Sequence, residues 1–253
     1  MNKESLIQIK QIENIGIVSF NQISHSNPNI SNLISEFRQD LHTLNLRNDL
    51  RVIIFQGFEN VYSYPCPTKM LDSLTGISNF RMSDSIAAVE LPSLAILNGN
   101  IFDQALELAL ATDIRIASDT AQFRMGQLLS GKIPWDGGSQ RLPKIVGQGR
   151  ALEITLTCRQ INSEDALSIG LISRIINNLN LDTESINLAK QISHASPIAV
   201  KFLKESILTG LELHLNEGLK LEADLNFLLQ HSFDRAEGIR SFVSRKKPRF
   251  RGE

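Results

Sequence analysis

The chain has 253 residues, 42% hydrophobic and 21% charged, with a formal net charge of -1. This composition is that of an ordinary soluble protein, and a charge so near zero gives no field that would draw in nucleic acid or an anionic membrane. The two cysteines, Cys66 and Cys158, form no CxxC or Cys/His cluster, which argues against a disulfide framework and a metal site. A polar N-terminus and the lack of a long apolar run lead us to expect a cytoplasmic protein with no nucleic-acid or membrane partner.

Strands and helices alternate through the first half of the chain. The apolar patterns and turn signals predict, in chain order, strands at 5–12 and 15–20, a helix from the N-cap Ser31 to about Leu44, a strand at 52–56, a weaker helix at 76–91, a strand at 94–97, a buried helix at 106–111 and a strand at 113–118.

The second half of the chain becomes wholly helical. We expect a helix from near Pro143, another with Ser163 as its N-cap, a strand at 171–176, and helices throughout the region beyond Asp182. This order predicts an α/β core, residues 1–180, followed by a C-terminal helical region, residues 181–253.

The turn between the strand at 94–97 and the helix at 106–111 raises the first functional question. Backbone N–H groups at such strand-to-helix turns bind anionic groups of ligands, and glycines are expected there. This chain has Phe102, Asp103 and Gln104 instead.

Five stretches, in order, resemble the crotonase (enoyl-CoA hydratase/isomerase) superfamily: LPSLAILNG (91–99), ELALATDIRIASDTAQF (107–123), GKIPWDGGSQRLPKIVGQGRALEITLT (131–157), SEDALSIGLISRII (163–176) and DRAEGIRSFVSRKKPRF (234–250). The resemblance implies a spiral of ββα units with two roughly perpendicular sheets, outer helices, and a C-terminal helical region that forms trimers or hexamers. It also implies an acyl-CoA thioester ligand, no further cofactor, and chemistry through an enolate held by two backbone N–H groups.

Both of these N–H groups lie in altered surroundings. The resemblance assigns one to Gln104, in a turn where the family has three glycines and this chain has Asp103, Gln104 and Ala105. Asp103 stands where an N-cap would, so its carboxylate is able to compete for the helix N–H groups, and a well-capped structural helix is the alternative to a working oxyanion hole.

The resemblance assigns the second donor to Cys66, between Pro65 and Pro67, with Tyr64 as a neighbouring candidate for substrate binding. Its N–H is retained, although the two prolines restrict the backbone. No basic residue is placed to lower the pKa of the Cys66 thiol, which favours an inert thiol over a nucleophile.

Two glutamates hold the attacking water in the hydratases of the family. The first aligns with Glu107, whose apolar surroundings favour a functional role, although a pair with Arg115 or Arg124 is the structural alternative. The second aligns with Gln127, which is able to hydrogen-bond a water but not to exchange a proton.

Asp136 is the candidate for a second acid, because the family loop P-G-A-G-G-T-Q-R-L here reads PWDGGSQRL. Trp135 is positioned to line an acyl pocket and to raise the pKa of Asp136 by desolvation. The alternative is a turn at Asp136 and Gly137, with Trp135 filling the core.

The matching region of the last helix implies that Phe242, Arg245 and Lys246 contact CoA, sometimes that of a neighbouring subunit; a solvated basic tail is the alternative. The leading hypothesis is therefore an acyl-CoA-processing hydratase, isomerase or lyase with Glu107 as acid and base. Its rival is an inactive crotonase fold that binds CoA or serves as a subunit of an oligomer.

Overall fold

The computed structural model describes residues 5–22, 30–61 and 81–253. The strands of this part of the chain are β1 (Ile7–Ile12), β2 (Ile15–Phe20), β3 (Val52–Gln56), β4 (Ser93–Leu97), β5 (Asn100–Phe102), β6 (Ile114–Ser118), β7 (Gln122–Arg124), β8 (Ile161–Asn162) and β9 (Arg174–Ile176). The helices are α1 (Ile30–Asn45), α3 (Met82–Ala87), α4 (Gln104–Ala109), α5 (Gly138–Val146), α6 (Gln148–Thr157), α7 (Ser163–Ser168), α8 (Leu181–Ser193), α9 (Pro197–Gly210), α10 (Leu215–Gln230) and α11 (Phe233–Ser244), with short 3-10 turns η1 (Phe58–Asn60), η3 (Gln127–Ser130) and η4 (Asn178–Asn180).

The described strands form two sheets. The larger has the order β1-β2-β3-β4-β6-β9, with β1 antiparallel to β2 and all later neighbours parallel. Successive residues of β3 face opposite sides: Val52 and Ile54 belong to the cluster under α8, whereas Ile53 and Phe55 belong to the main core. Both faces of this strand are therefore buried, which explains its unbroken apolar sequence.

The smaller sheet has the order β5-β7-β8; the family resemblance predicted a second sheet, but its individual strands were not predicted. Its strands have three residues or fewer, too short to show an apolar period. The strand predicted at 94–97 is confirmed as β4, and the buried helix is confirmed as α4, which begins at Gln104. Between them lies β5, so α4 follows the smaller sheet rather than the larger one.

Several predicted helix starts were wrong. Helix α1 already includes Ser31, so this residue is not its N-cap. Helix α5 begins at Gly138 rather than near Pro143. The side chain of Asn162, not that of Ser163, caps α7, because Ser163 is buried and donates instead to the carbonyl of Ser118 at 2.6 Å.

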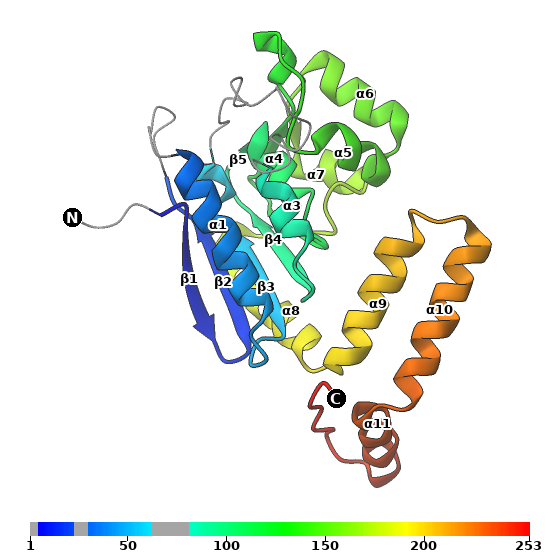
Figure 1. Cartoon of the computed structure of the whole chain (residues 1–253). Coiled ribbons are helices and arrows are strands. Elements are labelled where there is room, and N and C mark those ends of the chain that lie inside the picture. The colour runs from blue at the N-terminus through cyan, green and yellow to red at the C-terminus, as the bar shows by residue number, and fades with distance from the viewer. Residues whose placement is uncertain (1–4, 23–29, 62–80) are drawn as a thin grey trace.

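The helical region beyond Asp182 is confirmed up to Ser244, and its parts are arranged differently. Helix α8 packs on the larger sheet, whereas α9 and α10 form a hairpin that projects away from it, with α11 at the base of that hairpin (Figure 1). The division into a core, residues 1–180, and a helical region, residues 181–253, stays a prediction. In the described part of the chain, no helix is long and apolar enough to cross a membrane.

Lys204 anchors the projecting hairpin to the core. Its Nζ donates to the carbonyl of Val89 at 2.7 Å and to that of Leu91 at 3.0 Å, and it pairs with Asp113 at 2.7 Å. The same Asp113 oxygen accepts from the backbone N–H and the hydroxyl of Ser93, at the start of β4. One ammonium group therefore joins α9, the segment before β4 and the segment before β6.

Lys204→Met should lower the free energy of unfolding by about 2–4 kcal/mol, because two carbonyls lose their Lys204 donor and the half-buried carboxylate of Asp113 loses its cationic partner. Lys201→Met is the matched control: Lys201 lies on the same helix, but its pair with Glu90 is more than half exposed, so the loss should be below about 1 kcal/mol. Urea denaturation at one protein concentration measures both; equal losses would contradict the anchoring role.

Candidate active site

The turn between β5 and α4 keeps a glycine-like backbone despite its side chains. Asp103 has φ 53° and ψ -116°, a left-handed conformation that costs a non-glycine residue about 1–3 kcal/mol. The Asp103 N–H donates to the carbonyl of Arg124 at 2.9 Å, at the end of β7. The chain then reverses directly into α4, so this strained residue sets where the helix begins.

The carboxylate of Asp103 does not cap α4, so the predicted competition for the helix N–H groups was wrong. An N-cap residue has an extended backbone, and the positive φ of Asp103 directs its side chain elsewhere. Its Oδ1 accepts the backbone N–H of Gly126 at 2.6 Å. Asp103 therefore links the turn to the segment between β7 and η3.

Glu107 lies one helical turn further on and is 1% exposed. Its Oε1 accepts from Nε2 of Gln127 at 3.0 Å, and its Oε2 accepts the backbone N–H groups of Asp136 and Gly138, both at 2.8 Å. These three donors are all neutral. They come from two segments that are separate in the sequence, so the carboxylate of Glu107 joins η3 to the loop before α5.

The alternative in which Glu107 pairs with an arginine was wrong. Arg115 donates instead to the carbonyls of Leu171 and Thr112, both at 2.8 Å. The guanidinium of Arg124 lies over the ring of Phe102, 4.4 Å from its centroid. The pKa of Glu107 is raised to about 7: burial without a cationic partner is the largest cause, the charge of Asp136 adds to the rise, and the donated hydrogen bonds oppose both.

Gly138 is required where it meets Glu107. A Cβ added at Gly138 would lie 2.4 Å from Cε of Met125 and 2.8 Å from Cγ of Glu107. The backbone approaches this closely because no side chain intervenes. The sequence signals this residue only through the Gly-Gly pair of the PWDGGSQRL loop.

Asp136 is fully buried, and its backbone and side chain bind different partners. While its N–H donates to Glu107, its Oδ1 accepts the N–H of Ser83 at 3.1 Å and its Oδ2 accepts from Nε2 of Gln104 at 3.0 Å. Burial raises the pKa of Asp136, and the hydrogen bonds from Gln104 and Ser83 oppose that rise. No sequence pattern pointed to Ser83, because it contributes a backbone group from a short helix.

Gln127 has one polar atom left over. Its Nε2 donates to Glu107, but its Oε1 is buried and has no hydrogen-bond partner in the described part of the chain. Buried carbonyl oxygens of side chains are usually satisfied by protein or water. This oxygen lies on the same amide group that donates to Glu107, so a small donor bound there would lie beside that carboxylate.

Of the remaining predicted site residues, the structure describes Trp135, Phe242, Arg245 and Lys246. Cys66 and Tyr64 lie outside the described residues. Trp135 is partly buried and packs against the main core, and its place in an acyl pocket stays a prediction. Phe242 is 86% exposed on α11, and Arg245 and Lys246 follow that helix, at the opposite end of the molecule from α4 and α5 (Figure 1).

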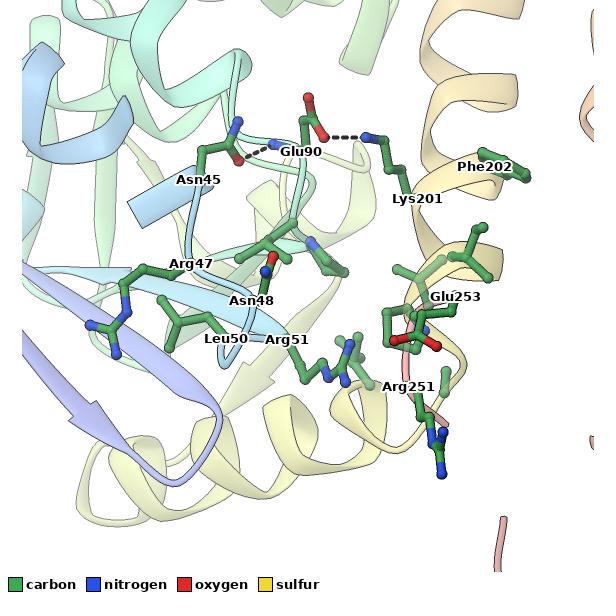
Figure 2. A pocket seen from close by; sticks show the side chains of 18 residues that line it. Asn45, Arg47, Asn48, Leu50, Arg51, Glu90, Lys201, Phe202, Arg251 and Glu253 are labelled. Atoms are coloured by element: carbon green, nitrogen blue, oxygen red, sulfur yellow. Dashed lines mark hydrogen bonds and ion pairs between the residues drawn. The ribbon is translucent and has the colours of Figure 1, made fainter. Parts of the chain in front are cut away.

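A cavity of about 510 Å³, whose lining Figure 2 shows, contains none of the residues of this hydrogen-bond cluster. Its lining includes Arg51 and Pro92, which precede β3 and β4. The turn at Asp103 instead follows β5, which comes after the opposite end of β4. Lys201 pairs with Glu90 inside it at 2.5 Å, so charges of both signs line the cavity (Figure 2). None of the predicted site residues that the structure describes lines it. The described residues also contain no group of acidic, histidine or cysteine side chains arranged to hold a metal ion.

Comparisons with known proteins agree on one family. The family model described as enoyl-CoA hydratase/isomerase matches residues 10–253. A mitochondrial enoyl-CoA hydratase of Pongo abelii is 31% identical, over 100% of this chain and 89% of its own length. The solved structure of an enoyl-CoA hydratase from Bacillus anthracis has a TM-score of 0.86 at 27% identity, covering 98% of this chain and 100% of its own. A structure of an enoyl-CoA hydratase subunit from Geobacillus kaustophilus has a TM-score of 0.84, also at 27% identity, covering 98% of each chain.

The raised pKa of Glu107 predicts a specific dependence of stability on pH. A pKa raised from 4.5 to about 7 stabilises the folded protein fully below pH 4.5, and this contribution is lost as the pH rises through 7. Relative to Glu107→Gln, the wild-type protein should therefore lose on the order of 3 kcal/mol between pH 4.5 and 8.

The variant preserves the packing, because its amide oxygen is able to accept from Asp136 and Gly138 while the amide of Gln127 turns over to accept from the new NH₂ group. Denaturant unfolding of both proteins across this pH range measures the difference. Parallel pH profiles would contradict the assigned pKa of Glu107.

Proposed function

Because the chain belongs to the enoyl-CoA hydratase/isomerase family, we propose that it adds water to the double bond of an enoyl-CoA thioester, with Glu107 as the acid and base. The observation that supports this most strongly is the buried carboxyl group of Glu107, whose pKa is about 7. A general acid or base is most effective when its pKa lies near the working pH, since both protonation states are then populated.

Gln127 positions the water in this proposal. The unpartnered Oε1 of Gln127 accepts one hydrogen of the water, and the carboxylate of Glu107 accepts the other. Gln127 does not exchange protons, so Glu107 alone performs the proton transfer. This division of roles between Glu107 and Gln127 favours hydration over isomerisation, because in many isomerases of the family the residue at the position of Gln127 is the catalytic base.

The reaction then balances with one carboxyl group. Glu107 takes a proton from the water as its oxygen bonds to C3 of the enoyl group, and the electrons of the C2–C3 double bond move toward the thioester as an enolate. The N–H groups of Gln104 and Cys66 hold the developing oxyanion, a form of stabilisation that contributes about 3–4 kcal/mol per donor. Glu107 returns the proton to C2, which restores the carboxylate and leaves a 3-hydroxyacyl thioester.

Asp136, the candidate for a second acid, holds and tunes Glu107 in this proposal and transfers no proton itself. Its charge raises the pKa of Glu107, and its N–H holds Oε2 of that carboxylate in place. Phe242, Arg245 and Lys246 bind the CoA portion of a substrate held by a neighbouring copy, because they lie at the opposite end of their own chain from Glu107 (Figure 1).

The non-catalytic alternative has its own supporting observation. Oε2 of Glu107 already accepts two backbone N–H groups, and both oxygens of Asp136 accept donors, as in a structural network. In that case the protein binds CoA thioesters or serves as a subunit without turning them over. Activity measurements on Glu107 variants separate the two functions.

Glu107→Gln should lower kcat for hydration of crotonyl-CoA by about 10²–10⁴, with little change in CoA affinity, because it removes only the exchangeable proton.

Two companion variants test the neighbouring residues. Asp136→Asn should also lower kcat, and Gln127→Glu should raise kcat by restoring a second proton-exchanging group. Mass spectrometry of the products and calorimetry with acyl-CoA measure turnover and binding separately. Glu153→Gln, an exposed substitution on α6, is the control. Binding without turnover, and no gain from Gln127→Glu, would favour the non-catalytic function.

Assembly is the second test of this proposal. Helices α9 and α10 expose large apolar side chains, among them Leu203 (61%), Leu211 (77%) and Phe227 (63%). Such a surface is costly in a monomer, and with the family resemblance it leads us to expect a trimer or a hexamer. Light scattering at micromolar concentration should give one of these masses; a monomer would contradict the assembly and the shared CoA site together.

A further inference from the structure

The turn that in the family carries glycines here carries two side chains with defined partners. Asp103 binds Gly126, which directly precedes Gln127, and Gln104 binds Asp136. Glycine has no side chain with which to make either link. We propose that Asp103 and Gln104 are positioning residues, which hold Gln127 and Asp136 against Glu107. This inference rests on the proposed hydration and names further residues on which it depends.

The link from Gln104 runs through a fully buried region. Gln104 is 1% exposed and Asp136 0%, and their side chains meet at 3.0 Å. The backbone N–H of the same Asp136 donates to Glu107 at 2.8 Å. Fixing the side chain of Asp136 therefore fixes the direction of its N–H, so Gln104 acts on Glu107 through one intervening residue.

The link from Asp103 reaches the other loop. Its carboxylate accepts the N–H of Gly126 at 2.6 Å, a short charge-assisted bond, and the next residue, Gln127, donates to Glu107 at 3.0 Å. A Cβ at Gly126 would lie 2.9 Å from Nε of Arg124 and 3.3 Å from Oδ1 of Asp103, so the loop is close-packed there. A glycine at position 103 would adopt this positive φ without strain, but it would not make the link to Gly126.

Variants of Asp103 separate positioning from stability. Asp103→Gly removes the link and relieves the positive φ, so the melting temperature should stay the same or rise while kcat falls about tenfold or more and KM stays within about twofold. Asp103→Asn keeps an acceptor oxygen and tolerates the left-handed backbone, so kcat should return to near the wild-type value. If kcat of both variants equals or exceeds that of the wild type, the link to Gly126 has no positioning role and the inference is overturned.

Gln104→Leu removes the side-chain link and retains the backbone N–H proposed for the oxyanion hole. It should lower kcat about tenfold with KM unchanged. It should also lower the pKa of Glu107. Without the hydrogen bond from Gln104 the pKa of Asp136 rises, so Asp136 carries less negative charge and raises the pKa of Glu107 less. Gln140→Leu, an exposed glutamine on α5, is the matched control and should change neither quantity. An unchanged kcat and an unchanged pKa of Glu107 in Gln104→Leu would overturn the inference.

Two readouts keep this inference separate from the proposed function. If the wild-type protein hydrates no enoyl-CoA, the proposed function fails. The positioning is then decided by ¹³C NMR titration of the Glu107 carboxyl group in Gln104→Leu and by hydrogen exchange at the Gly126 amide in Asp103→Gly. A lower pKa and faster exchange support the positioning roles; wild-type values of both overturn them.

Discussion

A carboxyl group buried without a cation is the constraint on which the site depends. Glu107 receives only neutral donors: one side-chain amide and two backbone N–H groups. Neutral donors offset part of the desolvation penalty, and the remainder appears as a pKa of about 7. A cation at this place would hold Glu107 ionised and remove its value as a proton carrier at neutral pH.

The need to supply those donors shapes the surrounding backbone. The loop before α5 must bring the N–H groups of Asp136 and Gly138 to one oxygen, which requires a glycine at 138. Asp136 is in turn bound to the first turn of α3 through Ser83. The carboxyl group of Glu107 therefore depends on α3, α4, η3 and the start of α5 at once; of these, α3, α4 and α5 share the main core.

Much of this arrangement was predictable from local pattern. Four consecutive apolar residues of β3 predicted a strand, and the apolar helix around Glu107 marked its carboxylate as unusual. The strands of the smaller sheet escaped prediction because pairing, not periodicity, defines two or three residues as a strand. Asp103 does occupy the N-cap position, but its carboxylate was wrongly predicted to accept the helix N–H groups, because it binds the N–H of Gly126 instead. The backbone N–H donors of Ser83 and Asp136 do not depend on residue type, and Gly138 is signalled only by the Gly-Gly pair of its loop. The sequence alone was therefore not sufficient to find all three donors. Predictions for Cys66 and Tyr64 lie outside the described residues.

The most direct test of this account is the titration of the Glu107 carboxyl carbon in the wild-type protein, followed by ¹³C NMR and assigned by comparison with Glu107→Gln. The account predicts a midpoint near pH 7, the value expected for a buried carboxyl group with neutral donors. A midpoint at the ordinary glutamate value near 4.5 would show that solvent or a cation reaches this group, and would contradict both the buried network and the acid–base role proposed for it.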